Sequence, residues 1–152
     1  MKAIRKALTR LSGRFRARKQ PVISIDDPGL RVVVSAFDEA EAASSALGRS
    51  AQWRADEPAV LRHHLVVPEH EVATAQELLA PDGWTLRTGG EVAEQGEHFD
   101  AEGPGTVVAL RVQVLDALHC SQESSRMAGL AQRLGGRALG WDALQPAPPE
   151  AG

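Results

Sequence analysis

The chain has 152 residues, of which 43% are hydrophobic and 24% are charged, and its formal net charge is -3. These values are typical of one globular domain and exclude a wholly disordered chain. The single cysteine excludes an internal disulfide and any zinc site built from several cysteines. Because no apolar run approaches the roughly 20 residues that cross a bilayer, we expect a soluble, cytoplasmic protein.

The net charge conceals two segments of opposite sign. Residues 1–19 contain eight basic side chains and no acidic one, whereas the rest of the chain has nine basic and 20 acidic groups, a net charge of -11. The apolar residues of the first segment recur at helical spacings: Ile4, Leu8, Leu11 and Phe15. This pattern predicts a basic amphipathic arm that either stays solvated or binds an anionic partner, a membrane surface or RNA. The acidic body favours a basic protein partner.

The first predicted unit follows the arm. Residues 20–29 contain turn-forming residues and are a predicted linker. Leu30–Phe37 is a short, nearly continuous apolar run, which predicts a buried strand. Asp38 is predicted to cap an alanine-rich helix that ends near Leu47, and Trp53 then lies in a short extended piece. The order is strand, helix, strand.

The same order recurs in a second unit. Val60–Val67 is a predicted strand, Pro68 opens a helix, and Trp84 begins the next strand. His63-His64 lies in the middle of the first strand. Successive side chains in a strand point to opposite faces, so the two imidazoles cannot share a metal ion from these positions. We predict no metal site here.

A third unit spans Val107–Leu144. Its first strand alternates, with Leu110, Val112 and Val114 on one face and Ala109, Arg111 and Gln113 on the other. Ser121 is predicted to cap the helix, Gly135-Gly136 to end it, and Leu139–Ala143 to form the closing strand with Trp141 at its centre.

The order of units predicts an α+β fold. We expect a ferredoxin-like antiparallel sheet with helices on one face, extended by an extra N-terminal β-α-β unit. Residues 30–144 form one predicted domain, and residues 145–152 form a proline-rich, disordered tail. Between the second and third units lies a long acidic loop, residues 89–105, without Lys or Arg.

Catalytic patterns are sparse. The strongest candidate for a catalytic motif is His119-Cys120 at a helix start, because a helix N-terminus lowers a thiol pKa. A lone cysteine, however, is more often a small buried hydrophobe. We therefore predict no catalytic, cofactor-binding or metal-binding residues.

Three features in this order resemble one known family. They are His63-His64 in a strand, the acidic segment Glu91–Glu102 before the third unit, and the closing Gly140-Trp141. Residues 61–144, which contain all three, resemble the regulator of ribonuclease activity B (RraB) family, the protein inhibitors of ribonuclease E.

The resemblance implies a non-enzymatic regulator of a ribonuclease E-type endonuclease that binds the nuclease, or another basic protein, through an acidic surface. The partner-binding residues that we then expect are His63, His64, Trp84, Glu91, Glu94, Glu97, Asp100, Glu102 and Trp141. Two other hypotheses are a ligand-binding or regulatory ferredoxin-like module unrelated to ribonuclease, and a thiol enzyme that uses Cys120. The sequence predicts no oligomeric state.

Overall fold

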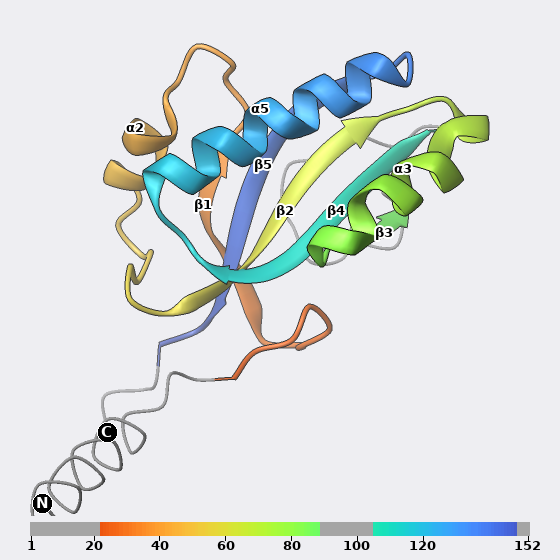
Figure 1. Cartoon of the computed structure of the whole chain (residues 1–152). Helices are drawn as coiled ribbons and strands as arrows, with labels where there is room; N and C mark the ends of the chain where they lie inside the picture. The colour runs from red at the N-terminus through yellow and green to blue at the C-terminus, as the bar shows by residue number, and fades with distance from the viewer. Residues whose placement is uncertain (1–21, 89–104, 149–152) are drawn as a thin grey trace, which may run out of the picture.

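A computed structural model describes residues 22–88 and 105–148 (Figure 1). The elements, with two short 3-10 turns η1 and η2, are β1 (Leu30–Ala36), α2 (Ala43–Gly48), β2 (Pro58–Val66), η1 (Glu69–Glu71), α3 (Val72–Leu79), η2 (Ala80–Asp82), β3 (Thr85–Thr88), β4 (Thr106–Val114), α5 (Ala117–Arg133) and β5 (Arg137–Pro146). The basic arm, residues 1–19, lies outside the described residues. No helix within the described ranges is long and apolar enough to span a bilayer.

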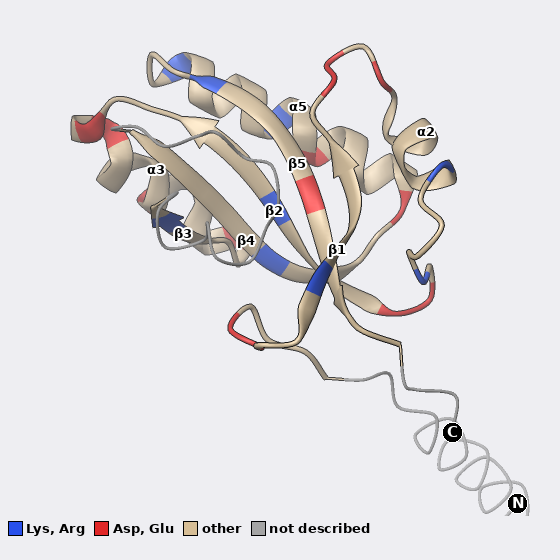
Figure 2. Cartoon of the chain, turned by 180° about the vertical axis from the view of Figure 1, so that it is seen from behind, with Lys and Arg blue, Asp and Glu red and all other residues tan. Residues whose placement is uncertain are grey.

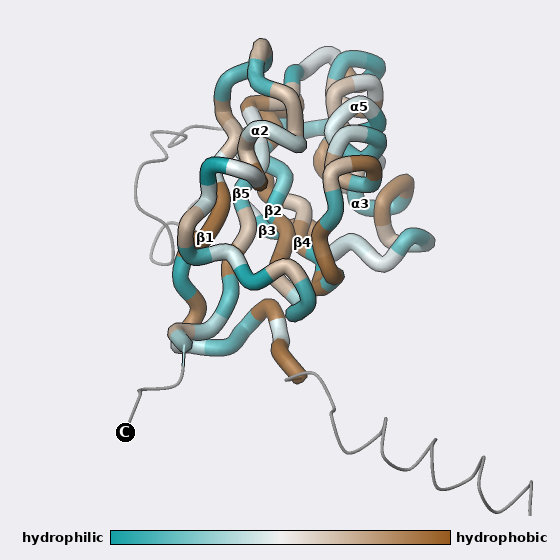
Figure 3. Tube along the Cα trace, turned by 90° about the vertical axis from the view of Figure 1, so that its left-hand side faces the viewer, coloured by the Kyte–Doolittle hydropathy of each residue, from teal (hydrophilic) through white to brown (hydrophobic). Residues whose placement is uncertain are grey.

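The five strands form one sheet in the order β1-β5-β2-β4-β3, and every neighbouring pair is antiparallel. Helices α2, α3 and α5 all lie on one face of this sheet, as Figures 1 and 3 show from two directions. The opposite, helix-free face is turned toward the viewer in Figure 2. The predicted α+β class and antiparallel sheet are therefore confirmed.

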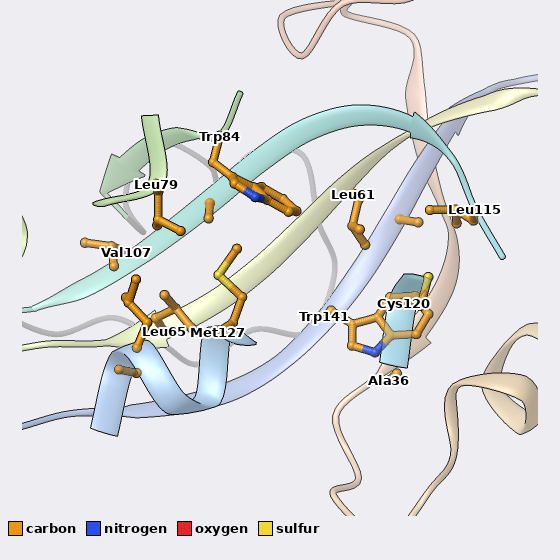
Figure 4. Packing of buried hydrophobic residues seen from close by; sticks show 14 of the residues in the cluster. Ala36, Leu61, Leu65, Leu79, Trp84, Val107, Leu115, Cys120, Met127 and Trp141 are labelled. Atoms are coloured by element: carbon orange, nitrogen blue, oxygen red, sulfur yellow. The ribbon is translucent and has the colours of Figure 1, made fainter. Parts of the chain in front are cut away.

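The main core fills the space between the sheet and the helices. Helix α5 contributes Met127 and Leu130 to this core, which also contains Leu61 and Leu65 of β2; Figure 4 shows Met127 beside Leu65. Trp84 and Trp141 are also buried in this core. Each large side chain removed from water contributes about 1.5–3 kcal/mol to folding, so this layer holds the helices on the sheet.

A second, smaller core lies on the helix-free face. Residues 22–29, here called the strap, precede β1 and place Ile23 and Ile25 against apolar residues of this face. The strap's Asp26 forms an ion pair of 2.7 Å with Arg87 of β3, at the other edge of the sheet. The predicted linker is thus, over its described residues, a packed segment that crosses the sheet.

Helix α2 begins later than predicted. The Asp38 carboxylate accepts a hydrogen bond from the Ala40 N–H at 2.9 Å, which closes a local turn instead of starting a helix. The helix then begins at Ala43, five residues after Asp38. Trp53 is half-buried and lies outside the strands.

Two further boundaries differ from the prediction. Asp116, not Ser121, caps α5, because its carboxylate accepts from the His119 N–H at 2.8 Å; Ser121 lies within the helix. The predicted tail also begins too early, since β5 continues to Pro146. The reason is the buried amide of Gln145, which bonds both the N–H and the C=O of Arg54 at 2.9 Å.

The alternation of β4 is confirmed, but its polar face is the one under the helices. Val112 and Val114 are 37% and 43% exposed on the helix-free face. Arg111, on the other side, stacks 4.1 Å above the Trp84 ring and bonds the side chains of Gln113 and Glu123. These partners satisfy the guanidinium, so it can lie beneath α5.

Candidate functional site

The two histidines and the Gly-Trp pair that carry the family resemblance lie side by side in the structure. In the register of β2 and β5, His63 is opposite Trp141 and His64 is opposite Gly140. Antiparallel strands place such partners about 5 Å apart. Two motifs that are far apart in the sequence therefore form one site at the centre of the sheet.

His63 belongs to the helix-covered side of this site. Its side chain is 2% exposed, and its ring meets the Trp84 ring nearly edge-on at a centroid distance of 5.3 Å. Its Nε2 has no hydrogen-bond partner among the described residues. Burial, reinforced by the neighbouring His64 and Arg111, lowers the pKa of His63 to about 3, so the imidazole is neutral at neutral pH.

This burial predicts a loss of stability in mild acid. The folded-state pKa of about 3 lies below the ordinary value of 6.5, so the unfolded chain takes up the proton first and stability falls as the pH drops from 6.5 toward 3. We expect the free energy of unfolding to fall by about 2–3 kcal/mol between about pH 7.5 and about pH 4.5 from His63 alone. Urea unfolding at both pH values measures it.

The matched variant for this experiment is His63→Leu, which keeps the side chain large and removes the titrating group. The variant should lose less stability between the two pH values than the parent chain. Equal losses would show that His63 is protonated in the folded state and that its burial does not disfavour the charge.

On the helix-free side, His64 joins a buried charged network. The Arg62 guanidinium donates two hydrogen bonds to the Asp142 carboxylate, one of them 2.7 Å long from Nε to Oδ1. His64 Nε2 lies 3.1 Å from the same Oδ1. All three side chains are buried. Burial acts to raise the pKa of Asp142, but the bonds from Arg62 and His64 outweigh it and hold that pKa below its ordinary value.

A pocket of about 570 Å³ opens beside this site on the helix-covered face. It lies between α5, the first half of β5 and the segment that joins β1 to α2. His63 and Trp141 line it from the sheet, and Ser124 and Ser125 line it from α5. Its volume falls in the range of small-molecule binding sites.

The predicted site residues divide into two groups. His63, His64, Trp84 and Trp141 are each 2–5% exposed, so their side chains present little surface to a protein partner. The predicted acidic residues, Glu91, Glu94, Glu97, Asp100 and Glu102, lie outside the described residues.

Sequence reasoning missed Arg62 and Asp142. One signal was present, because each charge interrupts an apolar strand next to a motif residue. A lone charge in a buried strand needs a partner, and the second charge sits in the neighbouring strand.

Cys120 does not have the environment of a nucleophile. The side chain is buried, and burial, with the nearby charges of Glu123 and Asp116, raises its pKa to about 12. The thiol therefore stays protonated at neutral pH. No cluster of three or more His, Cys, Asp or Glu side chains suited to a metal ion occurs in residues 22–88 and 105–148.

No protein-family model matches the chain, and no characterised protein or solved structure shows significant similarity to it.

Proposed function

We propose that this chain is a non-enzymatic protein inhibitor of a ribonuclease E-type endonuclease, which it binds through an acidic surface to slow RNA decay in the cytoplasm. The observation that carries the proposal is the pairing of His63-His64 with Gly140-Trp141 across β2 and β5. Two of the three motifs of the RraB resemblance thereby lie side by side, which supports the proposal of a shared family architecture.

We further propose a ferredoxin-like core. Support comes from the element order β2-α3-β3-β4-α5-β5 and from the spatial order β5-β2-β4-β3, a β-α-β-β-α-β chain folded into one antiparallel sheet. In this proposal, β1 and α2 are the extra N-terminal unit, added to the sheet at the β5 edge.

Charge supports a basic partner. Residues 22–88 and 105–148 contain 14 acidic and nine basic side chains, and the acidic loop adds to this excess. Six of the nine arginines are already paired with acidic side chains. A basic segment of the nuclease would be attracted by the remaining negative charge, with an affinity that falls as salt rises. The arm, residues 1–19, would serve a separate anionic partner, RNA or a membrane surface.

The test measures nuclease binding and inhibition with the full chain. We expect the chain to capture a ribonuclease E-type endonuclease at low salt, to release it as salt rises, and to slow its cleavage of an RNA substrate. A variant with the acidic residues of the 91–102 segment changed to their amides should neither capture the nuclease nor slow its cleavage of RNA.

The matched control changes acids on the α3 side, Glu69, Glu71 and Glu77, to glutamine, and it should bind like the parent chain. Failure of the parent chain to capture or slow the nuclease at any salt concentration would refute the proposed inhibitor function.

A second candidate function is a ligand-binding or regulatory ferredoxin-like module unrelated to ribonuclease. The observation that favours it is the pocket between α5, β5 and the β1–α2 segment, which is large enough for a small molecule.

A further inference from the structure

The pocket beside α5 has an excess of negative charge at its rim. The segment between β1 and α2 contributes the carboxylates of Asp38, Glu39 and Glu41, against one cationic lining residue, Arg137. Arg49 binds the Glu41 carboxylate at 2.7–2.8 Å. One Asp38 oxygen accepts from the Ala40 N–H. Glu39 is exposed and stands at the rim.

The interior of the pocket is apolar and aromatic. Trp141 and Leu139 line it from β5, and Phe37, whose ring packs against the His64 ring at a centroid distance of 5.3 Å, lines it beside the carboxylates. Aromatic faces next to carboxylates attract organic cations, because ring and carboxylate both present negative charge to the ligand. The same lining repels an anionic ligand of equal size.

His63 supplies an independent indication of a ligand. It lines the same pocket, its side chain is 98% removed from solvent, and its Nε2 lacks a hydrogen-bond partner among the described residues. An unsatisfied buried polar group is costly, and a ligand that approaches the imidazole can offset that cost.

We infer that this pocket binds a small organic cation, with its flat apolar body against Trp141 and Leu139, its positive group at the rim carboxylates, and its far end toward His63. The inference rests on the second candidate function and names the class of its ligand. It does not depend on any nuclease.

The test uses two probes of similar size and opposite charge, tryptamine and indole-3-propionate, titrated into the full chain labelled with ¹⁵N. We expect tryptamine to shift the signals of Ser124, Gly140 and Trp141 in a saturable way. Indole-3-propionate should bind at least about tenfold more weakly, because it meets the rim carboxylates with a like charge.

Three variants test the assignment to this pocket. Glu39→Gln should weaken tryptamine binding about threefold, as expected for one exposed charge pair, and Arg137→Gln should strengthen it by a similar factor. Glu77→Gln, an exposed residue of α3 outside the pocket lining, should change nothing.

Two results would overturn the inference. Equal binding of both probes would leave a ligand pocket but refute its preference for cations. The absence of shifts from either probe would refute the ligand site itself. Neither result bears on nuclease capture, so the proposed inhibitor function is judged separately.

Discussion

Replacing Asp142 with alanine is expected to lower the free energy of unfolding by about 3–5 kcal/mol. Asp142 is the partner that compensates the buried charge of Arg62, whose side chain is 2% exposed, and it also bonds His64. Removing the carboxylate leaves a guanidinium in the interior without its counter-charge, and desolvating a charge costs far more than losing a neutral hydrogen bond. Urea unfolding followed by circular dichroism measures the loss.

Two controls test whether the loss of stability comes from the buried Arg62–Asp142 ion pair. The double variant Arg62→Met with Asp142→Leu removes both charges and should be more stable than Asp142→Ala, because no buried charge is left over. Glu41→Ala, which breaks the exposed ion pair with Arg49, should hardly move the unfolding midpoint. A loss below about 1 kcal/mol for Asp142→Ala would mean that water reaches Arg62 and that the network is not a buried one.

Replacing Gly136 with alanine is expected to lower the free energy of unfolding by about 3 kcal/mol. A Cβ at this position would lie 1.8 Å from the Val66 carbonyl oxygen and 2.9 Å from the Val67 Cα, both backbone atoms at the end of β2. Backbone cannot move aside as a flexible side chain can, so the start of β5 must shift away from β2. Unfolding in urea, with the same probe, measures the effect.

Gly129 is the matched control for this substitution. It lies inside α5, and a Cβ built there meets nothing within 4 Å. Gly129→Ala should therefore raise the free energy of unfolding by about 0.5–1 kcal/mol, because alanine restricts the unfolded chain and favours the helix. If both alanine variants changed stability in the same direction, close backbone packing at Gly136 would not be the cause.

Most of the strands could be predicted from the sequence because their patterns are strong and local. The apolar run Val60–Val67 corresponds to β2, and the alternating stretch from Val107 corresponds to β4. The end of α5 also followed from local chemistry, since Gly135 has a φ of +87° and the Gly136 N–H bonds the Ala131 carbonyl oxygen.

The remaining features depend on contacts that no local pattern encodes. Alternation in β4 separates two faces, but only the partners of Arg111 decide which face lies beneath α5. Likewise, an aspartate such as Asp38 is equally common at helix caps and in turns, and here its side chain closes a turn. The site at the centre of the sheet arises from the register of β2 against β5, which brings Asp142 to Arg62.

The register of β1 against β5 has a consequence for how the domain can be joined to other proteins. Leu30, where β1 begins, lies opposite Pro146, where β5 ends, so the chain enters and leaves the sheet at one point. A domain whose ends meet in this way can be inserted into a surface loop of a host protein without pulling the host's strands apart. Its sheet and pocket would be carried intact into such a chimera.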